Sequence, residues 1–517
     1  MNEKSSTVTD PVGDLPGRPV SFWIDTAPRT DYPALDRELK VDALVVGGGI
    51  AGLTTALMLQ ESGVSTAVVD FRRIAAGVSG HTTAKVTSLH GAAYRKLIKI
   101  FGTERAGMYA GANQAGLEGI ADLIAKKGIE CDFSRASAYT YAANDRENGL
   151  IEEEVKASQS VGLPTFYVDD TPLPFPTKGA VCIREQARFH PRKYLLALAV
   201  SLTEAGGLIF ENTRAVGLKK EGSSYRITTD RGDIRAGHVV AATNFPFHDP
   251  AFAFARMYQK RSYVLGIRIT HPAPQGMFIS VEEPFHSVRR HPMESGEIVL
   301  VGGQVHRTGH VCNTAGLYKR LENFARDHFD VSSIEYRWST QDNVTVDGVP
   351  FIGNPSPMHG NFSIITGFAG WGMAHSMVAA MIVSDGILGR RNEWQDLYSP
   401  FRFRPGSTLS MMEQNLHVAG TFLKDRLATT PQAIDAEALG PGQGGVFASD
   451  HDRAGIARDR TGTLHAVSPV CTHMGCLLRW NNAEESWDCP CHGSRFDSDG
   501  GVIHAPAKKD LEKKPVP

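Results

Sequence analysis

A glycine motif near the start of the chain limits the possible folds more than any other feature. Residues 43–46 form a short apolar run, typical of a strand buried on both faces, and residues 53–60 have apolar positions at helical spacing. Between them lie Gly47, Gly49 and Gly52, at the spacing G-x-G-x-x-G. This order of strand, glycines and helix predicts a dinucleotide-binding βαβ unit.

Each residue of the motif has its own expected role. Gly47 permits a tight turn, Gly49 lets the backbone approach a pyrophosphate, and Gly52 lets helix and strand pack closely. The free N–H groups at the start of the helix, where Ile50 and Ala51 lie, attract the phosphates. We therefore expect all five residues to contact or shape a dinucleotide site.

A second apolar run, residues 66–69, ends at Asp70 and Phe71. Asp70 lies about 20 residues beyond the glycines, where a carboxylate accepts hydrogen bonds from a ribose hydroxyl. The alternative is a membrane span, because residues 41–60 have about the required length. Asp42 and four glycines within that stretch argue against a span.

Composition excludes several classes of protein. The 517 residues allow several domains, and 42% hydrophobic with 21% charged residues is typical of a soluble globular protein. A net charge of -2 gives no indication of nucleic acid or an anionic membrane as partner. The N-terminus is polar and has no apolar signal core, so we expect a cytoplasmic location.

Several later blocks have the character of ligand-binding segments. Residues 75–90 are small, polar and glycine-bearing, which suits close approach to a ligand. Residues 239–244 read as a buried strand, and residues 364–372 as a strand followed by a glycine turn. A long apolar helix is expected over residues 373–388, with further helices over 92–127, 190–205, 317–329 and 409–427.

Together these blocks resemble the superfamily of FAD-dependent enzymes that includes glycine oxidase, sarcosine oxidase and D-amino-acid oxidase. The resemblance covers about residues 41–404 and rests on the glycine motif with Asp70 and on residues 80–85, 190–195, 239–244, 347–353 and 366–373. It implies FAD as cofactor, with contacts beyond the first motif at Gly80, His81, Thr82, Thr83, Ala84, Val216, Ala242, Thr243, Gly353, Gly367, Gly370, Trp371, Gly372 and Met373. The alternative for the last block is an ordinary strand–turn–helix.

The resemblance also implies a chemistry. In this superfamily a C–H bond beside an amine nitrogen delivers hydride to the flavin, and the protein supplies positioning and electrostatics. Lys85 lies where family members place residues along the reactive face of the flavin, although a solvated lysine is the alternative. Arg261, Tyr263 and His306 are candidates for holding a substrate, because an arginine or tyrosine often binds the substrate carboxylate in this family.

Four of the seven cysteines crowd into the end of the chain. Cys471 and His473 have the spacing C-x-H, and Cys489 and His492 the spacing C-x-x-H. Two thiolates and two imidazoles match the ligand set of a Rieske [2Fe–2S] centre, with both histidines on one iron. A four-coordinate zinc site could use the same residues and is the alternative.

The two sequences Cys-Thr-His-Met-Gly-Cys and Cys-Pro-Cys-His-Gly-Ser resemble the cluster-binding loops of Rieske proteins nearly residue for residue. In the respiratory branch of that family, cysteines at the positions of Cys476 and Cys491 form a disulfide, which a reducing cytosol would oppose. Ser494 matches a residue whose hydroxyl bonds a cluster sulfur. Phe496 stands where that branch usually has a tyrosine.

The expected fold is therefore α/β (α+β): a Rossmann-like FAD-binding domain, an inserted mixed-sheet substrate domain and a small all-β Rieske domain. The predicted divisions are an N-terminal arm over 1–40, the FAD-binding domain over 41–91, 180–250 and 340–397, the substrate domain over 92–179 and 251–339, a linker with a helix over 398–430, and the Rieske domain over 431–517.

Two redox centres in one chain predict stepwise electron transfer, because flavin accepts two electrons as hydride whereas the cluster accepts one at a time. The first hypothesis is a dehydrogenase for a small amine or amino acid, which passes electrons through the cluster to an external acceptor. A second is an FAD oxidase that uses oxygen, with a structural or sensing Rieske domain. A third is an electron-transfer protein without a small organic substrate.

Overall fold

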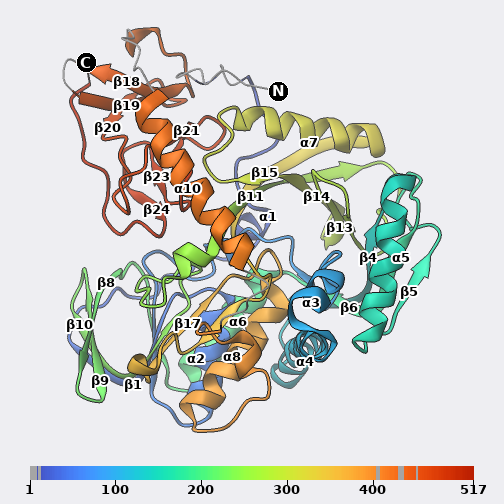
Figure 1. Ribbon diagram of the computed structural model, residues 1–517, viewed down its shortest axis with the longest axis horizontal. Coiled ribbons are helices and arrows are strands. Elements are labelled where there is room, and N and C mark those ends of the chain that lie inside the picture. The colour runs from blue at the N-terminus through green and yellow to red at the C-terminus, as the bar shows by residue number, and fades with distance from the viewer. Residues whose placement is uncertain (1–8, 10–12, 403–407, 429–435, 450–451, 517) are drawn as a thin grey trace.

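A computed structural model describes residues 9, 13–402, 408–428, 436–449 and 452–516 of the chain. Two large sheets form its body, and two small sheets form the C-terminal tail (Figure 1). The predicted junction at residues 430–431 lies outside the described residues, as do positions 1–8 and 10–12 of the predicted arm. Among the described helices, none has the length and apolar character needed to cross a bilayer.

The first large sheet is built on the strand that precedes the glycine motif. β1 lies between β2 and β10, parallel to both, and its last four residues are buried. The sheet order is β16-β17-β10-β1-β2-β7, with β9 on β10 and β8 on β9. Its strands are β1 (Leu39–Val46), β2 (Thr66–Val69), β7 (Leu208–Phe210), β8 (Ala215–Glu221), β9 (Ser224–Thr229), β10 (Asp233–Ala241), β16 (Phe351–Gly353) and β17 (Phe362–Thr366).

Three helices pack beside this sheet. The glycine motif leads into α2 (Ile50–Glu61), which contacts both α6 (Pro191–Glu204) and α8 (Gly372–Ile387). α2 and α8 are apolar over most of their surface, which fits helices buried on more than one side. The N-termini of α2 and α8, the two helices that follow glycine turns, both border the site described below.

The second large sheet is mixed, with the order β15-β11-β14-β13-β12-β4-β6-β3 and β5 on β6. Most pairs are antiparallel, whereas β12 and β4 run parallel. Its strands are β3 (Lys85–Val86), β4 (Ser134–Tyr141), β5 (Thr165–Val168), β6 (Ala180–Arg188), β11 (Met257–Ile269), β12 (Met277–Ser280), β13 (His286–Met293), β14 (Gly296–Arg307) and β15 (Val331–Thr345). Residues 180–188 thus pair in this sheet, although the sequence prediction placed them in the FAD-binding domain.

Helices cover the second sheet and join it to the first. α7 (Thr314–His328) packs on β11 and β14, and α5 (Asp145–Ser160) packs on β5 and β6. The helix expected over residues 92–127 is two helices, α3 (Tyr94–Phe101) and α4 (Thr103–Lys127). They separate at Gly102, whose φ of +81° is incompatible with continuing the first helix.

The N-terminal arm is anchored by α1 (Phe22–Asp25). Trp23 is fully buried, and its Nε1 donates a hydrogen bond to the carbonyl oxygen of Thr82 at 2.6 Å. The arm is therefore fixed to one of the predicted flavin-contacting segments. Short 3₁₀ turns occur at η1 (Val78–Gly80), η2 (Ala253–Arg256), η3 (Pro357–His359) and η5 (Ala436–Ala438).

The tail has its own small core. Trp480, Trp487 and Phe496 are buried together, with the two indole rings 5.0 Å apart. Its strands form one sheet of β18 (Gly444–Ser449), β19 (Asp452–Arg458) and β20 (Leu464–Val467), and another of β21 (Arg479–Asn481), β22 (Ser486–Asp488), β23 (Arg495–Asp497) and β24 (Val502–His504). α9 (Gln395–Tyr398) and α10 (Thr408–Ala428) precede the tail (Figure 1). Val418 and Phe422 of α10 pack on its core.

Candidate functional site

A cavity of about 1090 Å³ lies between the two large sheets and the tail. Its walls come from the glycine turn, the segment after β2, the end of β10, the middle of β15 and the turn before α8. Tail residues complete the wall, among them Glu484, Arg495, His504 and Lys508. One space is therefore shared by the predicted flavin site and the tail.

The glycine turn has the geometry that a dinucleotide requires. Gly47 adopts a φ of +110°, and its N–H donates to the carbonyl of Val69 at 2.8 Å. A Cβ on Gly52 would lie 1.9 Å from the carbonyl oxygen of Gly47, so only glycine allows this approach of helix and strand. Gly49 is the N-terminal cap of α2 and provides no side-chain cap, while the N–H of Ile50 donates to the hydroxyl of Ser79 at 3.0 Å, so a helix N-terminus that favours phosphate borders the cavity.

Asp70 lies at the end of β2 and lines the cavity. Its carboxylate accepts hydrogen bonds from the backbone N–H groups of Gly48 at 2.8 Å and Arg72 at 2.9 Å. Burial raises the pKa of Asp70, and the two amide donors partly offset this effect. The carboxylate is thus fixed beside the turn where the sequence places an adenosine ribose.

The cavity gathers most, but not all, of the predicted FAD contacts. Those that line it are Gly47, Gly49, Ile50, Ala51, Asp70, Phe71, His81, Thr82, Thr83, Ala242, Thr243, Gly370, Trp371, Gly372 and Met373. Those that do not are Gly52, Gly80, Ala84, Val216, Gly353 and Gly367. The role of two of them is internal packing, because a Cβ would lie 2.5 Å from the Ala75 oxygen at Gly80 and 2.6 Å from the Thr345 methyl at Gly367. Val216 is 41% exposed, and Ala215 forms the wall in its place.

The sequence predicts four candidate catalytic residues. Of these four, Lys85 lines the cavity and has no carboxylate partner within the parts of the chain that the structure describes. It lies on β3, and its Nζ donates a hydrogen bond to the hydroxyl of Ser287 on β13. Burial, together with the nearby guanidinium of Arg289, lowers the pKa of Lys85 to about 7. A buried amine of this pKa exchanges a proton readily near neutral pH.

Tyr263 and His306, which the sequence analysis offered as substrate contacts, do not line the cavity. Side chains alternate along β11, so Ser262 and Val264 face the cavity whereas Tyr263 faces α7. The Tyr263 ring stacks on His306 at 5.7 Å and meets Tyr318 of α7 edge-on at 4.7 Å. Both residues belong to the packing behind the cavity wall.

Arg261 reaches the cavity wall but is already paired. Its guanidinium donates to the carboxylate of Glu484 and to the hydroxyl of Ser339, and its side chain is 1% exposed. Glu484 also pairs with Arg495 at 2.5 Å. Although burial raises the pKa of Glu484, the guanidiniums of Arg261 and Arg495 outweigh it and hold the pKa at about 2. The predicted substrate arginine is therefore part of a charge network between the body and the tail.

The turn that carries Glu484 is inserted into the body. Thr314, at the start of α7, shares its one hydroxyl proton between the side-chain oxygens of Asn481 at 2.6 Å and Asn482 at 2.8 Å. The same hydroxyl oxygen accepts from the backbone N–H of Ala483 at 3.0 Å, and Ala483 packs in the hydrophobic core beneath the second sheet. The tail is thus docked by buried contacts. No feature of the tail sequence indicated this docking.

The tail also brings the four predicted metal ligands together. The thiols of Cys471 and Cys489 lie within hydrogen-bonding reach, and this contact lowers the pKa of Cys471 against the effect of burial. The rings of His473 and His492 lie 5.1 Å apart. Nδ1 of His492 is buried and has no hydrogen-bond partner among the described residues, which leaves it free to bind a metal.

Hydrogen-bond donors surround the two cysteine ligands. Backbone N–H groups of His473 and Met474 point at Cys471, and the hydroxyl of Ser494 bonds the same sulfur. The hydroxyl oxygen of Ser494 accepts in turn from the N–H of Ala507 at 3.1 Å. Such donors stabilise the negative charge of thiolates and sulfides, so the surroundings fit an iron–sulfur cluster.

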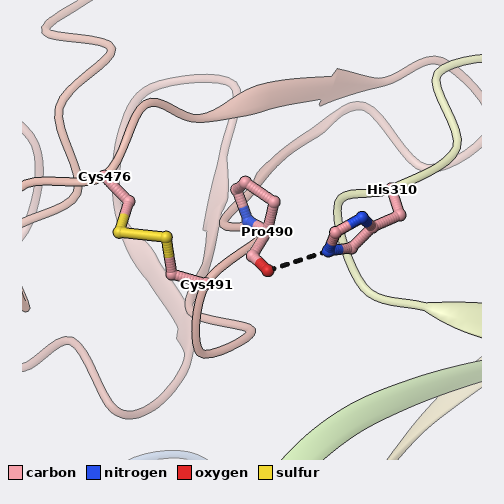
Figure 2. The surroundings of a disulfide bond; sticks show 4 residues. All are labelled: His310, Cys476, Pro490 and Cys491. Carbon is pink, nitrogen blue, oxygen red and sulfur yellow. Dashed lines mark hydrogen bonds between the residues drawn. A yellow bond between two sulfur atoms is a disulfide. The ribbon is translucent and has the colours of Figure 1, made fainter. Parts of the chain in front are cut away.

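A disulfide joins Cys476 to Cys491, with Cα atoms 6.5 Å apart (Figure 2). The sulfur of Cys489 lies within 4.8 Å of both disulfide sulfurs, so the bond connects the two ligand loops directly beside the metal site. The body also contacts the second loop, because Nε2 of His310 lies 3.0 Å from the carbonyl oxygen of Pro490 (Figure 2).

The histidine side of the centre faces the body. Phe254, in η2, meets the His473 ring at 5.7 Å and the His492 ring at 5.4 Å, both edge-on. η2 is held by Asp249, whose carboxylate accepts from the N–H groups of Ala253 and Phe254 at 2.8 and 3.0 Å. A turn of the body, fixed by Asp249, therefore contacts the rings of both histidine ligands.

Comparison with known proteins identifies both halves. The family of FAD-dependent oxidoreductases called DAO matches residues 42–386, and the Rieske [2Fe–2S] domain matches residues 432–515. A putative Rieske 2Fe-2S iron-sulfur protein of Bacillus subtilis, YhfW, is 35% identical over 497 residues, which is 96% of this chain and 97% of that protein.

More distant relatives share the flavin half. Gamma-glutamylputrescine oxidoreductase of Escherichia coli is 22% identical over 413 residues, covering 77% of this chain and 95% of its own. The crystal structure of glycine oxidase from Geobacillus kaustophilus superimposes with a TM-score of 0.61 at 17% identity, covering 71% of this chain and 99% of that one. The chain therefore belongs to the DAO family of FAD-dependent oxidoreductases, and its C-terminal Rieske domain binds a [2Fe–2S] cluster.

Proposed function

We propose that this enzyme oxidises a small amine or amino acid at its FAD and passes the electrons through its own Rieske cluster to an external acceptor. The observation that supports this most directly is the shared cavity: the flavin turn at Gly370 and tail residues such as Glu484 border one space. Phe254 of the body, moreover, contacts the rings of both histidine ligands. Both observations support electron exchange between the two centres within one chain.

FAD, when bound, supplies a hydride acceptor, and the [2Fe–2S] cluster supplies a one-electron carrier. A two-electron oxidation followed by one-electron export needs both. The Rieske domain would have no such use in an enzyme that gives both electrons directly to oxygen. Stepwise emptying of the flavin through the cluster is therefore the function that the fusion favours.

Lys85 gives the cavity a base for an amine substrate. An amine nitrogen must be uncharged before the adjacent C–H bond can release hydride, so a protonated substrate has to lose a proton on binding. Lys85 has a pKa of about 7 and is held toward Ser287 at the cavity wall. We assign it the role of accepting that proton.

The names of the relatives agree with this substrate class. The Escherichia coli relative acts, by its name, on gamma-glutamylputrescine, and the structural neighbour from Geobacillus kaustophilus is a glycine oxidase. One name is that of an amine and the other that of an amino acid. The cavity includes both apolar residues, such as Val264 and Ile279, and polar ones, such as Ser262, which suits a small amine-bearing molecule.

An anaerobic screen of amines and amino acids tests the proposal. A substrate should bleach the flavin absorbance first and the cluster absorbance afterwards. Bleaching of the flavin alone would instead support an oxidase with a structural or sensing tail. If no amine or amino acid bleached either centre, the protein would be an electron carrier without a small organic substrate.

With a substrate in hand, Lys85→Met tests the base. Loss of a general base typically costs about 10²–10⁴-fold in rate, so flavin reduction in a stopped-flow experiment should slow by that order. In the native enzyme the rate should fall as the pH decreases through about 7, because protonated Lys85 cannot accept a proton. Lys99→Met, an exposed lysine of α3 outside the cavity, is the matched control.

A further inference from the structure

One buried side chain connects the cavity wall to a cluster-binding loop. Gln341 lies in β15, is 2% exposed, and lines the cavity. Its Nε2 donates a hydrogen bond to the carbonyl oxygen of Gly493 at 2.9 Å, and its Oε1 accepts from the hydroxyl of Thr308 at 3.0 Å. Gly493 lies between His492, a cluster ligand, and Ser494, which bonds a ligand sulfur.

The cluster-binding loop packs so closely on β11 that Gly493 has no room for a side chain. Gly493 has a φ of +68°, and a Cβ at this position would lie 2.6 Å from Cβ of Gln259 on β11. Gln259 packs on the same glycine, but its Nε2 has no hydrogen-bond partner in the described part of the chain. Two buried glutamines therefore contact one glycine, and Gln341 is the one that bonds to it.

The other end of this connection lies at the flavin. Asp342, the next residue of β15, accepts a hydrogen bond from the N–H of Gly370 in the turn before α8. That turn is among the FAD-contacting blocks of the family resemblance, and Gly370 and Trp371 line the cavity. A continuous path of backbone and two side-chain hydrogen bonds, one made by Asp342 and one by Gln341, thus runs from the flavin turn to Gly493 and His492.

We propose that Gln341 is the positioning residue that couples the flavin cavity to the histidine-ligated iron. It fixes the cluster loop against the cavity wall and provides the hydrogen-bonded link through which electrons pass. No covalent bond would form or break: bound FAD, once reduced, would be the electron donor, the [2Fe–2S] cluster would accept one electron at a time, and an external one-electron acceptor would reoxidise the cluster. This role rests on the proposed internal transfer, although it does not depend on the identity of the substrate.

The test compares Gln341→Leu with Gln259→Leu in the full-length holoenzyme. The flavin is reduced by a light pulse with an external photoreductant, so no amine is needed, and reduction of the cluster is followed by its absorbance. We expect about a tenfold slower transfer in Gln341→Leu, equivalent to about 1.4 kcal/mol in the barrier, and an unchanged rate in Gln259→Leu. The electron paramagnetic resonance signal of the dithionite-reduced cluster should be the same in both variants.

Hydrogen–deuterium exchange gives a readout that does not depend on electron transfer. Amides of residues 489–494 should exchange faster in Gln341→Leu than in Gln259→Leu, because the loop has lost its bond to the wall. Gln341→Met keeps the length of the side chain and should show the same slow transfer. Native rates in both Gln341 variants would overturn the proposal, as would loss of the cluster signal in both, which would make Gln341 a purely structural residue. An absence of transfer in the native enzyme would instead contradict the proposed function.

Discussion

The two redox sites of this molecule are assembled in opposite ways. The four cluster ligands come from two loops of one small domain, between Cys471 and His492. The flavin cavity takes its walls from nearly the whole chain, from Pro19 near the start to Lys508 near the end. A site of the first kind can be identified from local spacing alone. A site of the second kind is defined by tertiary packing. In the flavin cavity, the glycine motif of residues 47–52 accounts for only one part of the wall.

The boundary between the sites makes the comparison sharper. From the sequence, the tail is a separate domain with its own cofactor. In the structure, Glu484 of the tail pairs with Arg261 of the body, and tail residues close the flavin cavity. The local site and the distributed site therefore share an interface, and the predictions below ask how far a change in one is felt in the other.

Loss of the cluster is the largest effect we expect. Cys489→Ser removes one thiolate ligand, so the purified protein should lack iron and labile sulfide and should not reduce an external acceptor. Because the ligands lie in two local loops joined by the Cys476–Cys491 disulfide, FAD content should stay near that of the native protein. Cys182→Ala, a buried free cysteine of β6, should retain both cofactors. Release of FAD from Cys489→Ser would mean that the two sites are not independent.

Breaking the charge network should cost less, but it should affect both halves. Glu484→Gln leaves the buried guanidinium of Arg261 without a counter-charge, which typically destabilises a protein by about 3–5 kcal/mol, whereas Arg495 keeps its ion pair with Asp488 at 2.8 Å. Thermal unfolding should begin at a lower temperature and FAD should be released more easily. Glu485→Gln, on the same turn but more exposed, is the control.

The same network predicts a pH dependence of stability. The folded-state pKa of Glu484, about 2, is below its usual 4.5, so its contribution is fully present above pH 4.5. That contribution should be lost as the pH falls toward about 2. The free energy of unfolding of the native protein and of the Glu484→Gln variant should be compared between pH 4.5 and about 2. If it falls equally in both proteins, the carboxylate does not stabilise the docked tail.

A smaller effect is expected at the glycine turn, where a substitution should weaken FAD binding and leave the cluster unchanged. Asp70→Ala removes a carboxylate that holds Gly48 and, by our assignment, the adenosine ribose. A charge-assisted hydrogen bond is worth about 1.5–3 kcal/mol, so equilibrium dialysis should show FAD bound about one to two decades more weakly. Iron content should not change. Asp36→Ala, an exposed residue of the arm, should bind FAD normally.

The smallest effect concerns the potential of the cluster. Ser494→Ala removes a hydrogen bond to the Cys471 sulfur that should strengthen on reduction, when negative charge increases. A net bond of about 1 kcal/mol corresponds to about 40 mV for one electron, so the midpoint should fall by that order in protein-film voltammetry. Ser498→Ala, four residues later, is the control. Equal midpoints in the two variants would mean that Ser494 does not bond the cluster in solution.

Much of the fold follows from sequence because local rules determine it. The strand expected over residues 66–69 is β2 (Thr66–Val69), and the helix expected over 373–388 corresponds to α8 (Gly372–Ile387). α5 (Asp145–Ser160) was not predicted, since its charged sequence buries little apolar surface, although Asn144 caps its start. The single helix expected over residues 92–127 was wrong at Gly102, where a left-handed backbone separates α3 from α4.

The candidate site shows the same division. The cluster ligands and the glycine turn are local motifs, and the structure brings their members together. Tyr263 and His306 were poor candidates because the sequence does not show which face of β11 and β14 meets the cavity. Arg261 could not be recognised as an interface residue, because its partner Glu484 lies more than two hundred positions away.

The central claim is that electrons pass within one chain from the flavin cavity to the cluster. The most direct test mixes the oxidised enzyme anaerobically with its substrate and follows the cluster by freeze-quench electron paramagnetic resonance at two protein concentrations. We predict that the cluster signal appears after flavin reduction, with a rate constant that does not change with protein concentration. A cluster that stays oxidised, or a rate that rises in proportion to protein concentration, would contradict internal transfer.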